Sequence, residues 1–176
     1  MLVADQITCI VQAAERYGVP ANVMLAVAEK EGGLVGQYVP NRNGTYDVGP
    51  MQFNTGYLRS LEQYGITPGD VAASGCYPYE LAAWRIKGHI GNDDGDLWTK
   101  AANYHSRTPY FNAIYRNDLE IKGRKWLEWL KTRYVLDVKP ASGRTMANQI
   151  KRRPVVSMTV DRRMSTYYVP RLIWAK

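Results

Sequence analysis

The chain has 176 residues, of which 45% are hydrophobic and 22% are charged, and its formal net charge is +7. This length suits one domain with a real hydrophobic core and is short for two. No apolar run approaches the roughly 18 residues that a membrane-spanning helix needs, so no transmembrane segment is expected. The first five residues lack the basic region and apolar core of a signal peptide, so we expect a cytosolic chain or one that begins after a removed leader.

The positive charge is concentrated toward the C-terminus. Residues 1–120 contain 9 Lys/Arg against 13 Asp/Glu, whereas residues 121–176 contain 14 against 3. Such asymmetry is typical of a segment that contacts an anionic surface or partner, for which wall polymers, lipid headgroups, nucleic acid and acidic proteins are candidates. A solvated extension without a partner is the alternative.

Two helices are predicted before a long loop. Apolar residues recur at helical spacing in residues 4–17, and a second helix is predicted for residues 21–31, ahead of a pair of glycines. Residues 33–50 are rich in Gly, Asn and Pro and are predicted to be irregular. A loop of this length inside a compact domain is uncommon and is more often functional than not.

Beyond this loop the sequence again predicts helices. They are expected at residues 51–64, from 68 onward, at 78–90, from 97 onward and at 109–134. Thr67 and Asp96 are residue types that favour the N-cap, so they are expected to start two of these helices. The apolar residues noted in the last helix are Ile114, Ile121, Trp126, Leu127 and Leu130.

The pattern changes after Pro140. Residues 155–160 and 166–169 have the β-branched and aromatic composition of strands, which favours a small hairpin or an extended arm. The sequence therefore predicts a mainly α-helical domain at residues 1–135 and a basic C-terminal extension at residues 136–176.

The sequence does not indicate a metal or cofactor. The two histidines and two cysteines lack the spacing of known zinc motifs, and no phosphate-binding loop occurs. The aspartates at 93, 94 and 96 lack the closing glutamate of the twelve-residue calcium loop, which favours a solvated loop that ends in a helix cap.

Glu31 is the candidate for acid chemistry. It shares one helix face with Met24, Val27 and Ala28, because the four residues follow the i, i+3, i+4, i+7 pattern. A carboxyl group beside apolar side chains loses hydration, which raises its pKa. Glycosidic cleavage needs such an acid to protonate the leaving oxygen. A partly exposed glutamate at a helix end is the structural alternative.

Cys9 and Cys76 leave two interpretations open. They suit a single disulfide that closes a loop of about 67 residues and adds about 4 kcal/mol to the free energy of unfolding. Two buried free thiols in a reducing compartment are the alternative.

Three short motifs occur in order along the chain. They are AEKEGG at residues 28–33, NGTYDVGPMQFN at residues 43–54 and AANYHS at residues 101–106. Together they resemble the soluble lytic transglycosylases, which carry an acid followed by Ser-Gly, a Gly-Leu-Met-Gln-Ile block and an Ala-Tyr-Asn block. The match is nearest to the small enzymes of type III and type IV secretion, conjugation and pilus systems. It covers roughly residues 5–120, and the order of all three motifs makes it specific.

The resemblance implies a lysozyme-like fold with an active-site groove and one catalytic residue. Glu31 would protonate the oxygen between N-acetylmuramic acid and N-acetylglucosamine in peptidoglycan. It would then take the proton from the muramoyl C6 hydroxyl, which closes a 1,6-anhydro ring. No cofactor or second carboxylate is needed, so Asp47 and Glu29 are expected to be dispensable.

The resemblance also implies roles for other residues. The implied substrate-binding residues are Gln52, Tyr104, Met51, Gly49 and His105. Among them, Tyr104 would orient Glu31 through its hydroxyl, Gln52 would hydrogen-bond the glycan or its own loop, and Met51 would pack beside the acid. The family places one cysteine before the catalytic helix and one in the loop after it, and Cys9 and Cys76 match those places.

Three positions depart from the family pattern. Gly32 stands where Ser is common, Pro50 replaces Leu, and His105 stands where Asn is common. We expect these departures to affect the preference for sugars more than the reaction.

Other functions compete with this interpretation. A goose-type lysozyme or phage lysin would hydrolyse the same bond, with Asp47 as the candidate base, and a non-catalytic module would only dock a complex on the wall. Nucleic acid is a weak candidate partner, because tail aromatics and arginines could stack on bases but no nucleic-acid motif accompanies them. The predicted partners are peptidoglycan and, through the tail, a secretion or conjugation apparatus, with a periplasmic or secreted location.

Overall fold

The computed structural model describes residues 2–133, and they form a mainly helical fold, as predicted. The helices are α1 (Ala4–Tyr17), α2 (Ala21–Glu31), α3 (Thr55–Arg59), α4 (Pro68–Ala72), α5 (Tyr77–Asn92), α6 (Leu97–Ala102) and α7 (Pro109–Arg133), with a 3-10 turn, η1 (Glu62–Tyr64). The strands are β1 (Tyr38–Pro40), β2 (Tyr46–Val48) and β3 (Phe53–Asn54). The predicted basic extension and its hairpin lie outside the described residues.

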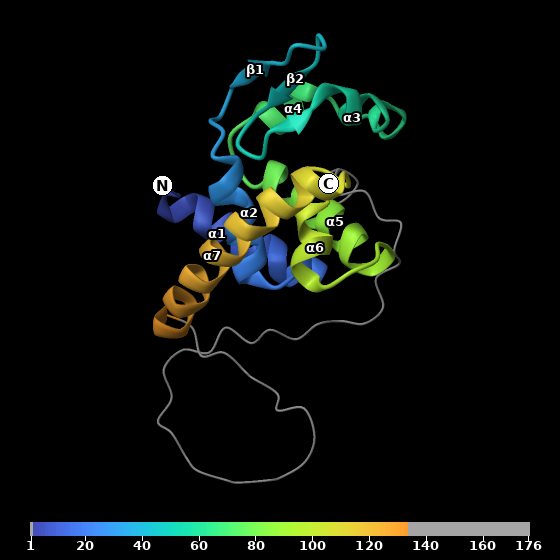
Figure 1. The fold of residues 1–176 in the computed structure, drawn as a ribbon. Coiled ribbons are helices and arrows are strands. Elements are labelled where there is room, and N and C mark those ends of the chain that lie inside the picture. The colour runs from blue at the N-terminus through green and yellow to red at the C-terminus, as the bar shows by residue number, and fades with distance from the viewer. Residues whose placement is uncertain (1, 134–176) are drawn as a thin grey trace, which may run out of the picture.

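The small sheet and the larger helices occupy different parts of the molecule. Strands β1, β2 and β3 form one antiparallel sheet in sequence order, with Val39 opposite Asp47 and Val48 opposite Phe53. Figure 1 shows this sheet, with α3 and α4, on one side of a body made of α1, α2, α5, α6 and α7. The chain passes from the body to the sheet directly after α2, so the end of α2 lies where the two parts meet.

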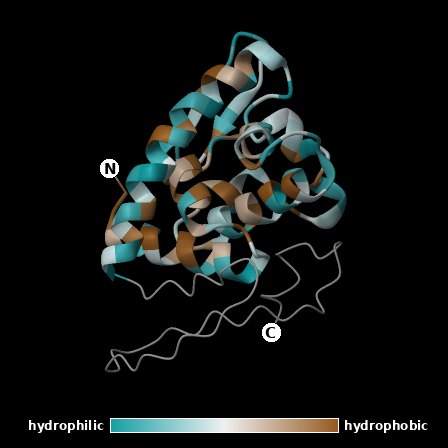
Figure 2. Cartoon of the chain, turned by 60° about the horizontal axis from the view of Figure 1, so that its bottom comes forward, coloured by the Kyte–Doolittle hydropathy of each residue, from teal (hydrophilic) through white to brown (hydrophobic). Residues whose placement is uncertain are grey.

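Helix α2 is the centre of the helical body. Residues 23–28 are all buried, and α2 packs against α1, α6 and α7. A helix that is apolar on every side is stable only when other elements surround it. The outer helices instead alternate hydrophobic and hydrophilic residues along their ribbons, as one-sided burial requires (Figure 2). No helix in residues 2–133 combines the length and the hydropathy that crossing a membrane requires.

The predicted starts and ends of several helices are confirmed. The bounds of α1 and α2 are those expected, and α1 ends at Gly18 in the left-handed conformation. Thr67 caps α4 in a reciprocal capping box with Asp70, and the Asp96 side chain accepts a hydrogen bond from the Thr99 amide at the start of α6.

The prediction for residues 33–64 was wrong in two respects. Two strands, β1 and β2, lie in the segment expected to be irregular, and the expected helix 51–64 is replaced by β3, short α3 and η1. Strands of two or three residues are too short to show a period of two in the sequence. The Asn54 side chain accepts from the Gly56 amide and so caps α3, four residues after the predicted start.

The buried face of α7 matches the apolar residues noted in the sequence only in part. Ile114 and Ile121 are 54% and 61% exposed, whereas Tyr115, Leu119 and Trp126 are buried. Trp126 and Leu130, which were noted from the sequence, do lie on the buried face. Hydropathy alone misplaced the two isoleucines and missed Tyr115, whose ring is buried with its hydroxyl bonded.

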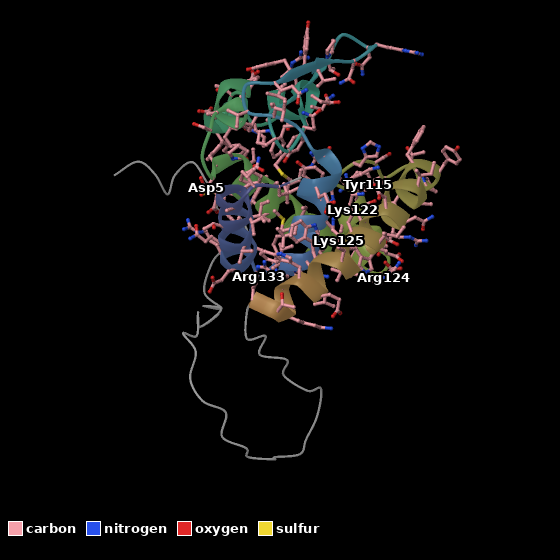
Figure 3. The ribbon with its side chains drawn as sticks, turned by 90° about the vertical axis from the view of Figure 1, so that its left-hand side faces the viewer. Asp5, Tyr115, Lys122, Arg124, Lys125 and Arg133 are labelled. Carbon is pink, nitrogen blue, oxygen red and sulfur yellow. A yellow bond between two sulfur atoms is a disulfide. The ribbon has the colours of Figure 1, made fainter. Side chains whose placement is uncertain are left out.

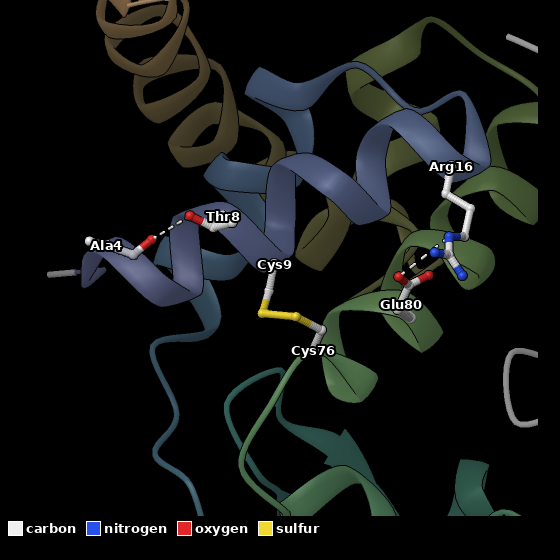
Figure 4. Close-up of a disulfide and its surroundings, with 6 residues drawn as sticks. All are labelled: Ala4, Thr8, Cys9, Arg16, Cys76 and Glu80. Atoms are coloured by element: carbon white, nitrogen blue, oxygen red, sulfur yellow. Dashed lines mark hydrogen bonds and ion pairs between the residues drawn. A yellow bond between two sulfur atoms is a disulfide. The ribbon is translucent and has the colours of Figure 1, made fainter. Parts of the chain in front are cut away.

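A disulfide joins Cys9 of α1 to Cys76, directly before α5, with a Cα–Cα distance of 4.9 Å. The single bridge is therefore present and neither thiol is free. Figure 4 shows a second connection between the same helices, in which Arg16 Nε lies 3.6 Å from Glu80 Oε1. The two links hold α1 against α5 at separate points.

Candidate active site

Glu31 lines a groove between the two parts of the molecule. It is the last residue of α2, and Gly32 ends the helix with a φ of +59°. The groove has a volume of about 500 Å³. Its lining residues are Glu31, Asn41, Arg42, Asn43, Asp47, Gln52, Asn54, Arg85, Tyr104 and His105.

The carboxyl group of Glu31 is set for proton transfer near neutral pH. Burial removes water from it and raises its pKa from 4.5 to about 7. A hydrogen bond from Tyr115 and the charges of Arg85 and Lys30 oppose this rise, while the charge of Asp47 adds to it. A carboxyl group that is part protonated at pH 7 can both give and accept a proton there.

Tyr115 holds the acid, a role that none of the sequence motifs indicated. Its hydroxyl donates a hydrogen bond to Glu31 Oε1. It comes from α7, 84 residues further along the chain, and in Figure 3 it lies at the end of α7 nearer the sheet, with Lys122, Lys125 and Arg133 following away from it. Its one available signal is its place on the buried face of α7.

Tyr104 has a different partner from the one expected. Its hydroxyl donates to the backbone oxygen of Met51 at 2.8 Å, so the prediction that it orients Glu31 through that hydroxyl was wrong. The bond instead ties the segment after α6 to the turn before β3. Met51 is fully buried, consistent with the packing role expected for it.

Gln52 sits beside the acid in a constrained turn. It has a φ of +49°, and its Nε2 donates to the backbone oxygen of Gly49 at 2.8 Å. A Cβ at Gly33 would lie closer than 3 Å to both of these atoms. The second glycine after Glu31 is therefore required so that the turn can approach the end of α2.

His105 lies in the groove with its ring stacked on that of Tyr115, at 4.8 Å between centroids and 2° between planes. Burial lowers the pKa of His105, and the nearby Lys30 charge acts in the same direction. A neutral imidazole beside the acid can pack against a ligand and exchange hydrogen bonds with it.

A polar network fixes the segment that carries Tyr104 and His105. Asp93 accepts hydrogen bonds from Asn103 at 2.8 Å and from Arg107 at 3.0 Å, and it lies 2.7 Å from His89 Nδ1. Burial raises the pKa of Asp93, but the hydrogen bonds from Arg107, His89 and Asn103 together outweigh it and lower the pKa to about 2.

The opposite wall of the groove comes from the sheet. Asp47 on β2 accepts from Asn54 Nδ2 at 2.9 Å, and the same amide nitrogen donates to Thr45 at 2.9 Å. The strands thus carry a second carboxylate into the groove that contains Glu31. Within residues 2–133, no three His, Cys, Asp or Glu side chains gather as a metal site would need.

Comparisons with known proteins give distant relatives. The chain is 29% identical over 123 residues to protein IpgF of Shigella flexneri, an alignment that covers 64% of this chain and 80% of that protein. It is 24% identical over 125 residues to invasion protein IagB of Salmonella typhimurium, which covers 65% of this chain and 78% of that protein. No protein-family model matches the chain.

Proposed function

We propose that this protein is a peptidoglycan lytic transglycosylase and that Glu31 is its only acid and base. The observation that carries the proposal is a carboxyl group with a pKa of about 7 in a groove lined by amides, charged groups and aromatic rings. Amide and aromatic side chains are the groups that bind sugars by hydrogen bonding and stacking. The order of the three sequence motifs supports the same reaction.

In the proposed reaction, the proton of Glu31 passes to the glycosidic oxygen between N-acetylmuramic acid and N-acetylglucosamine. The bond from that oxygen to C1 breaks, and the substrate's own acetamido oxygen stabilises the cation at C1. The Glu31 carboxylate then accepts the proton of the C6 hydroxyl, whose oxygen bonds to C1. Tyr115 stabilises the carboxylate between the two transfers through its hydrogen bond to Oε1.

Hydrolysis of the same bond is the second candidate, and Asp47 is the observation that favours it. Asp47 lines the groove with Glu31 and is held by Asn54. A carboxylate across the groove from the acid can activate a water molecule, as in inverting glycosidases. The product would then have a reducing end rather than a 1,6-anhydro end.

Digestion of purified peptidoglycan tests the proposal and separates the two reactions. We expect the wild type to release 1,6-anhydro ends, identified by mass spectrometry, Glu31→Gln to release none, and Asp47→Asn to retain activity. Reducing ends that disappear with Asp47→Asn would instead establish the hydrolase.

We propose that the enzyme opens the cell wall for a secretion or conjugation apparatus, from the periplasm or after secretion. The support is similarity to a protein named for invasion and to the motifs of secretion-associated enzymes. A wall-docking module would bind glycan in the same groove without cleaving it. The digestion therefore also tests this alternative, because such a module would release no glycan ends.

The basic segment after residue 135 is proposed to bind the wall or an apparatus component through charge. Residues 136–176 contain nine Lys/Arg against two Asp/Glu. We expect removal of this segment to weaken binding to wall sacculi at low salt, and added salt to weaken binding of the intact chain. Equal binding of the intact and shortened chains would exclude this role.

A further inference from the structure

Arg85 is a cation in the groove that takes no part in the proposed proton transfers, although its charge favours the ionised form of Glu31. It comes from α5, and its side chain lines the groove with Glu31. Its Cζ lies 4.1 Å from the ring centroid of Tyr57 and 4.5 Å from that of Tyr104. Its Nη2 donates to the backbone oxygen of Tyr104 at 2.9 Å. Two rings and one hydrogen bond therefore hold the guanidinium in one position.

The charge of Arg85 has no protein counterion within the described residues. Several partly buried cations there lie within 4 Å of a carboxylate, as Arg16 does with Glu80 and Lys30 with Asp118, but no such pair includes Arg85. Withdrawing a cation from water without a partner is unfavourable, and aromatic contacts offset only part of that cost. A guanidinium has five N–H donors, and the hydrogen bond to the Tyr104 backbone oxygen uses one of them.

We propose that Arg85 binds a carboxylate carried by the muramoyl side of the glycan, so that the groove selects an acidic strand over a neutral one. The inference rests on the proposed function, because it requires that the groove bind peptidoglycan. Each muramoyl unit carries a lactyl group on its own ring. Its carboxylate is free in strands without stem peptides, and in other strands it is amide-linked to a stem that has carboxylates of its own.

Two cations line the groove, and the geometry of Arg85 suits a carboxylate ligand better than the geometry of Arg42 does. A planar guanidinium matches a carboxylate through two parallel hydrogen bonds, and a fixed, partly buried one loses less free energy to ordering and salt screening. Arg42 also lines the groove, but it is exposed on the turn between β1 and β2. It is therefore the rival that the test must separate.

Binding measured by titration calorimetry on Glu31→Gln, which prevents turnover, tests the inference. The ligands are glycan strands without stems, the same strands with their lactyl carboxylates converted to primary amides, and strands with intact or amidated stems. We expect the carboxylate form to bind at least about tenfold more tightly than the matching amide, as for a hydrogen bond to a charged group. A preference between the two lactyl forms would identify the lactyl carboxylate as the ligand of Arg85. A preference between intact and amidated stems would identify a stem carboxylate instead.

The variants identify the residue. Adding Arg85→Gln is expected to abolish the preference for the carboxylate form, and Arg85→Lys is expected to retain part of it. Adding Lys87→Gln, which removes an exposed charge from the same helix outside the groove, is expected to preserve it.

Equal binding of acid and amide forms by Glu31→Gln would overturn the inference, even if Arg85→Gln failed to fold. Loss of the preference in Arg42→Gln but not in Arg85→Gln would overturn it as well. If Glu31→Gln bound none of the glycans, the proposed function itself would fail and the inference with it.

Discussion

At the scale of single residues, the environment of Glu31 opposes its charge. Burial dominates, and the carboxylate also lies at the C-terminal end of α2, where the unpaired carbonyl groups carry partial negative charge. Tyr115, Arg85 and Lys30 favour the charged form, so the pKa of about 7 is a balance of opposing effects. Removing one of them should move the pKa in a known direction.

The rate of glycan cleavage is expected to fall as the pH rises above about 7, because Glu31 must be protonated to start the reaction. The hydrogen bond from Tyr115 stabilises the charged form, so Tyr115→Phe should raise the pKa and move this alkaline limb to higher pH. It should also lower kcat, because the carboxyl group is less well held. Profiles of kcat/KM against pH measure both effects, and an unshifted limb would contradict this role of Tyr115.

Glu31 is also expected to cost the protein stability. Its folded-state pKa lies above the unfolded value, because folding favours the protonated carboxyl group. Its contribution to the free energy of unfolding is therefore highest below pH 4.5 and falls as the pH rises through about 7. Glu31→Gln cannot ionise and should therefore be more stable than the wild type at pH 8 by about 1–3 kcal/mol, with little difference at pH 4. Urea unfolding at the two pH values measures this, and an equal effect at both would refute the electrostatic cause.

At the scale of elements, the contact between α6 and α7 depends on a glycine. A Cβ at Gly123 of α7 would lie closer than 3 Å to the Trp98 ring of α6. Because α7 also carries Tyr115, the packing of these two helices positions the residue that holds the acid.

We expect Gly123→Ala to lower the free energy of unfolding by about 1–3 kcal/mol through overpacking. Gly91→Ala is the matched control, because Gly91 is also helical but a Cβ there would meet no atom within 4 Å. The control should be neutral or stabilising by up to about 1 kcal/mol, since alanine is the better helix former. Chemical denaturation of the two variants measures the difference, and similar effects would mean that Trp98 readily moves aside.

At the scale of the whole molecule, the disulfide links helix α1 to the start of α5, across a separation of 67 residues. This span includes α2, the sheet and therefore most of the groove. Closing a loop of this length restricts the unfolded chain more than the folded one.

Replacing both cysteines by serine is expected to lower the free energy of unfolding by up to about 4 kcal/mol. A reducing agent should destabilise the wild type by a similar amount and leave the double variant unchanged. Thermal unfolding of both proteins, with and without the reductant, measures this. No change in the wild type on reduction would show that the bridge contributes nothing to stability.

The sequence by itself determined the local features of this protein. Helices α1 and α2, the capping residues of α4 and α6, and the place of Glu31 at the end of an apolar face all follow from signals within a few residues of each other. Such signals act through backbone preference and side-chain spacing, which need no knowledge of distant contacts.

Tertiary packing decided the rest. The three strands are stable only beside one another, and the buried face of α7 was set by what α2 and α6 present to it. The hydrogen-bond partner of Glu31 lies 84 positions away in the sequence, and Arg85, which lines the same groove, comes from a third helix. Desolvation and hydrogen bonding depend on which surfaces meet in space, so the proton affinity of Glu31 is a property of the folded groove rather than of its motif.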